Sequence, residues 1–240
     1  MTIFAVLAGA TLRALLGRRR TLLMLLLAAT PVLLGLIVRL NREASTANVG
    51  PILDGLVIRV VLPLIALVFG TASLGAELDD GTAVHILTKP IDRSTIVLAK
   101  VAVAGSLTTT LVVPATVFAG ILMGGLHSIG VTLAVAFAVL IGSYVYVAIF
   151  VALSVVTSRG LIIGLAYSLI WEGLLAGILP GSQIFSVREY LGGIASVLAS
   201  QAVRDSLVGA GGFLYAGVTF GVALLVASAR LATYEIRGSD

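Results

Sequence analysis

Six long apolar segments constrain the fold of this chain more than any other feature of its sequence. They cover residues 21–38, 56–74, 96–122, 129–156, 161–179 and 207–229. A helix needs about 20 predominantly apolar residues to cross the hydrocarbon core of a bilayer, which is ~30 Å thick, and each segment has roughly that length or more. The sequence therefore predicts an all-α polytopic membrane protein with six transmembrane helices, forming a single transmembrane domain over residues 1–240.

The composition excludes several other classes of protein. Hydrophobic residues make up 59% of the chain and charged residues only 11%. A soluble domain carries about 25% charged residues, so lipid must solvate much of this molecule. The chain has no cysteine, which rules out disulfides, thiolate catalysis and cysteine-bound metal. His85 and His127 are far apart in the sequence, so we expect them to be loop residues and expect no metal site.

Lys and Arg fall mostly on one side of the predicted membrane. With the N-terminus inside, ten of the fifteen basic residues lie on cytoplasmic segments, and Arg18, Arg19 and Arg20 directly precede the first span. Cytoplasmic loops carry an excess of Lys and Arg, so we expect both chain ends in the cytoplasm, in a multi-pass protein of a bacterial plasma membrane. The basic residues then set topology, and we expect contact with membrane lipid but no nucleic-acid partner.

Two segments outside the spans have an amphipathic pattern. Residues 3–16 place Ile3, Leu7 and Leu15 with other apolar side chains on one helical face and Arg13 off it. This pattern predicts an N-terminal interfacial helix that leads into the first span. Residues 180–206 intersperse apolar with polar side chains, which predicts one or two short external helices between the fifth and sixth spans, at the outer surface or dipping into it.

The first internal loop, residues 75–95, is the most charged part of the chain. Glu77, Asp79 and Asp80 precede a helix-compatible stretch over residues 82–88, and acidic side chains suit the positive end of a helix. Lys89-Pro90 should end that stretch, because the residue before a proline disfavours the helical conformation. The pattern predicts a short cytoplasmic helix across the base of the bundle at about residues 80–90. An ordinary charged loop that obeys the positive-inside rule is the alternative.

The same loop resembles the hallmark of a known family. Glu77, Gly81-Thr82, Leu87, Lys89-Pro90, Arg93 and Lys100 follow the order found in the ABC-2 type permeases, the transmembrane subunits of ATP-binding-cassette exporters. The resemblance implies a permease that moves a hydrophobic or amphipathic substrate out of the cytoplasm or inner leaflet. It also implies that this loop is a coupling helix docking on an ATPase. The residues in contact with that ATPase would be Glu77, Asp79, Asp80, Gly81, Thr82, His85, Lys89, Pro90 and Arg93.

The source of energy is expected to be another chain. The sequence has no Gly-x-x-x-x-Gly-Lys-Ser/Thr loop, which is the motif that cradles nucleotide phosphates. We therefore expect no enzyme activity and no cofactor in this chain, with ATP and Mg on a partner ATPase. The resemblance implies two ATPase subunits and two permease copies, as a homodimer or heterodimer. In this family the first and fifth spans line the dimer interface, which makes the small pair Gly173 and Gly177 interface candidates.

Glu172 lies well inside the fifth predicted span. A carboxylate at membrane depth costs several kcal/mol unless it is paired or neutralised, which makes it a functional-site candidate. Two interpretations stay open: a group on the substrate path or linked to proton transfer, and a structural residue hydrogen-bonded to a neighbouring helix or near the outer surface. The nearby polar candidates are Tyr167, Ser168, Tyr144 and Tyr146.

Other functions are compatible with a chain of six apolar segments. A self-sufficient secondary carrier or channel needs polar groups across its spans for ion coupling, and one intramembrane acid is thin support for it. A mechanically coupled ABC complex that acts with an extracytoplasmic partner is a further alternative. An intramembrane enzyme needs a pair of acids or a Ser/His pair within the spans, and the sequence shows neither.

Overall fold

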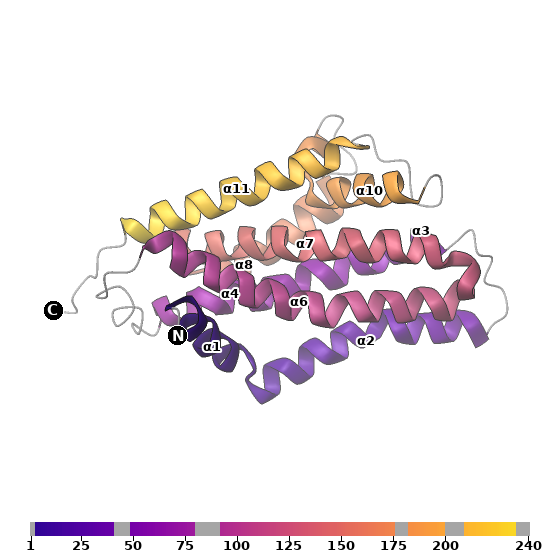
Figure 1. Ribbon diagram of the computed structural model, residues 1–240, viewed down its shortest axis with the longest axis horizontal. Coiled ribbons are helices and arrows are strands. Elements are labelled where there is room, and N and C mark those ends of the chain that lie inside the picture. Colours follow the sequence, from indigo (N-terminus) through magenta and orange to yellow (C-terminus); the bar gives the residue numbers. More distant parts are fainter. Residues whose placement is uncertain (1–2, 41–48, 80–91, 176–181, 200–208, 234–240) are drawn as a thin grey trace.

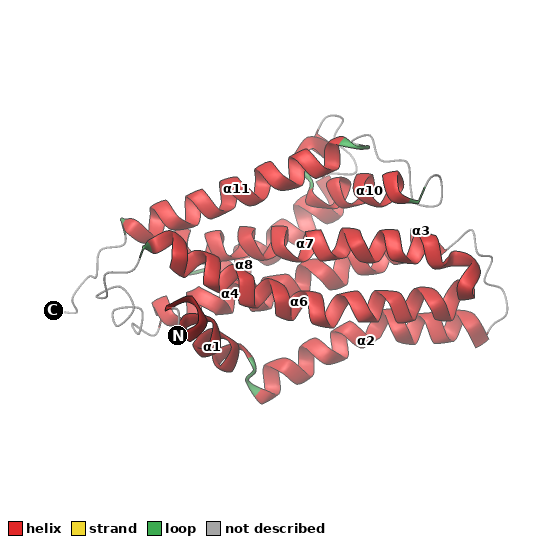
Figure 2. Ribbon diagram, in the orientation of Figure 1, coloured by secondary structure: helices red, strands yellow, loops and turns green. Residues whose placement is uncertain are grey.

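The computed structural model describes residues 3–40, 49–79, 92–175, 182–199 and 209–233, and these residues are almost entirely helical (Figure 2). The first half of the chain forms α1 (Ile3–Leu15), α2 (Arg18–Leu40), α3 (Val49–Leu53), η2 (Asp54–Val61), α4 (Leu62–Asp79), α6 (Arg93–Gly124) and η3 (Gly125–Ser128). The second half forms α7 (Ile129–Val156), α8 (Gly160–Ala166), η4 (Tyr167–Leu175), η5 (Ser182–Phe185), α10 (Val187–Leu198) and α11 (Gly211–Ala232). The predicted all-helical class is confirmed for this part of the chain.

Four helical ranges are long and apolar enough to cross a membrane. They are Arg20–Leu40, Val49–Gly75, Arg93–Val156 and Gly211–Ala232. The third range contains α6 and α7, which lie side by side and run in opposite directions (Figure 1). A shorter apolar helix covers Gly160–Gly173, within the fifth predicted segment. The sequence predicted six spans, and the structure supports four by length and composition in the described ranges.

The reversal between α6 and α7 depends on a glycine. Gly125 has a φ of 61°, a left-handed conformation that glycine adopts at little cost. The chain then makes the 3-10 turn η3, in which the Ser128 hydroxyl donates to the Gly125 carbonyl oxygen at 3.2 Å. The tight turn between α6 and α7 is formed in this way.

α7 lies at the centre of the bundle and packs against α4, α6, α10 and α11 (Figure 1). Its side chains Tyr146 and Phe150 are completely buried. Close packing with α4 requires Gly70, because a Cβ atom there would lie 2.9 Å from the Cβ of Phe150. Small residues of this kind let membrane helices approach closely.

The outer faces of the bundle are strongly apolar. Leu26 on α2 is 71% exposed and Leu225 on α11 is 69% exposed. A row of leucine and isoleucine side chains on α8 and η4 is exposed as well: Leu161, Ile162, Ile163, Leu165, Leu169 and Ile170. Such large exposed apolar faces are typical of surfaces covered by lipid or by another membrane subunit.

Two of the predicted spans contain a π-helical segment that the sequence did not predict. In the second span, η2 lies directly before Pro63, the second residue of α4. Proline has no N–H to donate to the residue four positions earlier, and the Leu62 N–H bonds to the Val57 oxygen, five residues back. In the fifth span, η4 carries Glu172. π-helical turns are rare and occur frequently at functional sites.

Several helix ends and α1 lie together at one end of the bundle. One end, here named the α1 end, contains α1, the end of α4, the start of α6 and the end of α11 (Figure 1). From this end α7 leads through a short turn into α8. α10 does not lie across the opposite end as a surface helix. It packs along α7 inside the bundle, with Leu191 against Gly142 near the middle of α7.

Candidate functional site

The N-terminus of α10 is built by a local sequence signal. Ser186 is the N-cap residue, and its side-chain oxygen accepts a hydrogen bond from the Glu189 N–H. Ser186-Val-Arg-Glu189 matches the capping-box pattern, a serine followed three residues later by a glutamate. The first N–H groups of a helix have no acceptor within that helix. The cap serves the Glu189 N–H, so the N–H groups of Val187 and Arg188 need another acceptor.

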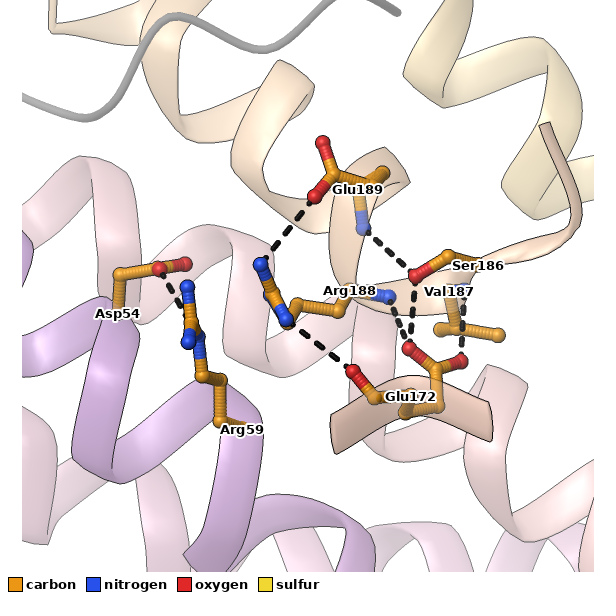
Figure 3. A network of polar contacts seen from close by, with 7 residues as sticks. All are labelled: Asp54, Arg59, Glu172, Ser186, Val187, Arg188 and Glu189. Atoms are coloured by element: carbon orange, nitrogen blue, oxygen red, sulfur yellow. Dashed lines mark hydrogen bonds and ion pairs between the residues drawn. The ribbon is translucent and has the colours of Figure 1, made fainter. Parts of the chain in front are cut away.

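The carboxylate of Glu172 is that acceptor. Its Oε1 accepts from the Tyr167 hydroxyl at 2.8 Å and from the Val187 N–H at 2.9 Å. Its Oε2 accepts from the Ser186 hydroxyl at 2.8 Å and from the Arg188 N–H at 3.3 Å. Glu172 is only 1% exposed, so the four bonds and the positive end of the α10 dipole replace the solvation that burial removes (Figure 3).

Arg188 ties the same two segments together from the other side. Its Nη1 donates to the backbone oxygen of Glu172 at 3.1 Å, and its Nη2 lies 3.3 Å from Oε1 of Glu189. Arg188 and Glu189 are 3% and 9% exposed. We name Tyr167, Glu172, Ser186, Arg188 and Glu189 the Glu172 network. A buried charge set of this kind is costly to break, because removal of one partner leaves another charge uncompensated.

A second charged pair lies beside the network on η2. Arg59 Nε is 3.8 Å from Oδ2 of Asp54, and the Asp54 side chain is 7% exposed. Figure 3 shows the Arg59 side chain turned toward Asp54, with Arg188 next to the pair. Asp54 and Arg59 also line a cavity of about 510 Å³ with Pro51 and Gly55. The two π-helical segments, η2 and η4, therefore each carry a buried carboxylate, Asp54 and Glu172.

Aromatic side chains of α7 pack against the network. The Phe150 ring meets the Tyr167 ring edge to face at 6.5 Å and stacks on Tyr146 at 6.0 Å. The Tyr146 hydroxyl is buried and has no hydrogen-bond partner in the described part of the chain. The geometry is that of a polar clamp set in an apolar bundle, beside the second half of α7.

Comparison with models of known protein families decides the assignment. The model for the ABC-2 family transporter protein matches residues 16–181. This chain belongs to the ABC-2 transporter family. The matched range includes α2 through η4 and therefore Glu172, but it ends before α10, so the network joins the matched part to the segment that follows it. No curated protein matches this ABC-2 family member.

The predicted ATPase-contacting residues lie at the α1 end of this ABC-2 protein, or outside the described ranges. Glu77 and Asp79 are in the last turn of α4, and Arg93 is the first residue of α6. Outside the described residues lie Asp80, Gly81, Thr82, His85, Lys89 and Pro90. The short helix expected at residues 80–90 and its contact with an ATPase stay predictions.

Of the other residues that the sequence predicted for this ABC-2 protein, some lie at the Glu172 network and others do not. Gly173 is exposed in η4. A Cβ atom added to it would meet only the Ser168 backbone oxygen, at 3.7 Å. Gly177 lies outside the described residues. Of the polar residues expected near Glu172, Tyr167 donates to it, whereas Ser168 bonds to the Gly164 oxygen and Tyr144 to Ser106. Ser186, Arg188 and Glu189 were not predicted as partners, although the capping-box pattern was available in the sequence.

Proposed function

We propose that this chain is the permease subunit of an ABC exporter. Membership of the ABC-2 family makes it a membrane permease of an ABC transporter, and the observation that carries this is the family match over residues 16–181. The finer proposal is that it moves a hydrophobic or amphipathic compound from the cytoplasm or inner leaflet to the outside. ATP hydrolysis on a separate subunit drives this movement.

The proposed topology has six spans and both chain ends in the cytoplasm. The grouping of α1, the end of α4, the start of α6 and the end of α11 at one end of the bundle supports it. In this orientation the segment that contains α10 dips into the membrane from outside. The N-terminus of α10 is its deep end, where it meets Glu172. Half-helices whose positive ends lie inside the membrane are a known device of transport proteins.

The proposed coupling element is the connection between α4 and α6. Both helices pack directly on α7, so a rigid-body shift at their junction would reach the centre of the bundle. Closely packed helices transmit such shifts as discrete movements, because a packed core does not deform continuously. The acidic residues Glu77, Asp79 and Asp80 would supply the charged contact with the ATPase.

Two copies of the permease are proposed to pair through α2 and the α8–η4 helix. The apolar side chains on these helices are exposed, and Gly173 has open space around it. A second copy, identical or related, would cover this surface. The complete exporter would contain two permeases and two ATPase subunits, with ATP and Mg bound only to the latter.

Transport by inverted membrane vesicles tests the proposal. Vesicles that contain this chain and its ATPase should accumulate a lipophilic dye when ATP is added, because export in the cell is uptake in an inverted vesicle. Reversal of the three acidic charges (Glu77→Lys, Asp79→Lys and Asp80→Lys) should abolish the uptake and release the ATPase, whereas Asp240→Lys serves as a charge control. An intact, active complex in the triple variant would show that the coupling assignment is wrong. Uptake without any ATPase would favour the carrier.

A further inference from the structure

A cavity of mixed polar and apolar lining at the α1 end is separate from the Glu172 network. It has a volume of about 200 Å³ and lies between the start of α2, the second half of α4 and the turn that joins α7 to α8. Arg20 lines it, together with the hydroxyl-bearing residues Thr71, Ser154, Thr157 and Ser158. Neither the ATPase coupling proposed above nor the Glu172 network uses this cavity.

The hydrogen-bonding capacity of the lining is mostly that of a donor. Arg20 makes no hydrogen bond or ion pair within the described ranges. Thr157 Oγ1 accepts from the Arg159 N–H at 3.2 Å, which leaves its own proton to donate. Ser158 is exposed. The hydroxyls of Thr71 and Ser154 already donate to backbone oxygens of their own helices, at 2.7 and 2.8 Å.

This arrangement selects an anion with several oxygen atoms. The described lining contains a guanidinium and two available hydroxyl protons, and it contains no carboxylate. Guanidinium groups bind phosphate oxygens through two parallel hydrogen bonds. The cavity is smaller than the roughly 300–1,000 Å³ of drug-sized ligand sites, so it fits a phosphate group better than a nucleotide.

The surroundings of the cavity are suited to a lipid. Leu161, which lines it, is 51% exposed, and Leu23, one turn beyond Arg20 on α2, is 63% exposed. Acyl chains placed along these side chains would bring a phosphate to the level of Arg20. We propose that this cavity binds the phosphate of an anionic headgroup in the leaflet at the α1 end, which is the inner leaflet in the proposed orientation. The proposal depends on neither the ATPase nor the export direction.

Lipid retention by the full-length chain tests the proposal. The chain is purified in detergent, exposed to equal amounts of phosphatidylglycerol and phosphatidylcholine, and examined by native mass spectrometry. Arg20→Gln should reduce bound phosphatidylglycerol about fivefold, since one basic side chain near a charged membrane surface contributes about that factor. Arg159→Gln is the matched control, because Arg159 is exposed on the same turn and does not line the cavity. It should change binding less than twofold.

A second arm separates the two sources of phosphate. If 10 mM inorganic phosphate raises the melting temperature of the wild type but not of Arg20→Gln, and no lipid is retained, the cavity binds a soluble phosphate compound. Retained phosphatidylglycerol that inorganic phosphate does not displace identifies a lipid. Equal retention by Arg20→Gln and Arg159→Gln overturns the proposal. If Arg20→Gln does not fold, the double variant Thr157→Val/Ser158→Ala must lower retention, or the proposal fails.

Discussion

Replacement of Glu172 should destabilise this protein more than replacement of a solvent-exposed acid. Glu172→Ala removes the acceptor of four hydrogen bonds and leaves Arg188 with less compensation. Bonds to a charged acceptor contribute about 1.5–3 kcal/mol each, which sets an upper bound. Because the freed donors can rebind to water or to each other, we expect a net loss of about 3–5 kcal/mol, as for removal of one partner of a buried ion pair.

The isosteric variant separates shape from charge. Glu172→Gln keeps one oxygen, which can serve two of the four donors, but its amide NH₂ group faces the other two. The expected cost is about 2–3 kcal/mol. Asp92→Asn is the control, since Asp92 is exposed and its side chain forms no cap on α6. A surface change of that kind costs less than about 0.5 kcal/mol.

Trp171 provides the assay. It is the single tryptophan of the chain, it is adjacent to Glu172, and its indole N–H donates to the Phe185 oxygen at 3.2 Å. Detachment of α10 should therefore shift its emission to longer wavelength. Glu172→Ala should also lower the melting temperature by on the order of 10 °C, from roughly 2–4 °C per kcal/mol for a chain of this length. Unchanged emission and melting in both Glu172 variants would refute the clamp. Unchanged export by Glu172→Gln would refute a transport role and leave the clamp intact.

Three further changes test the packing. Ser186→Ala should lower the free energy of unfolding by about 1–2 kcal/mol, because it removes an N-cap and a donor to Glu172, and denaturant titration measures this. Gly70→Ala should cost about 1–3 kcal/mol by overpacking against α7, whereas Gly217→Ala, where a Cβ meets nothing within 4 Å, should not destabilise. Gly173→Leu should leave the monomer stable and weaken chemical cross-linking between permease copies; unchanged cross-linking would remove Gly173 from the proposed interface.

Regular helices were the most predictable part of the structure. α7 has the predicted bounds, Ile129–Val156, because a continuous apolar run ends there at Thr157, whose backbone is extended. The N-terminal helix was also predicted within one residue, since its apolar side chains repeat with the period of a helix. Helix formation in apolar segments depends mainly on local sequence, so these boundaries could be read without knowledge of the fold.

The π-helical segments and the partners of Glu172 were less accessible. Pro63 restricts the hydrogen bonding of the helix that contains it, but an α-helical kink satisfies the same restriction. The sequence therefore did not predict the π-helical segment η2. Glu172 was identifiable as a costly group, yet its acceptor role depends on α10, which begins 15 residues later and folds back along α7. The capping box at Ser186 would have predicted where α10 starts. It would not have predicted that a carboxylate from another helix lies against its N-terminus.

The most direct test of the central claim is purification of the tagged chain from its native membrane. If the chain is the permease of an ABC exporter, an ATPase with a phosphate-binding loop should copurify with it. The complex should contain two copies of each subunit by mass and should hydrolyse ATP. A chain that purifies without any ATP-hydrolysing subunit, and that transports solute in liposomes with an ion gradient alone, would contradict the account.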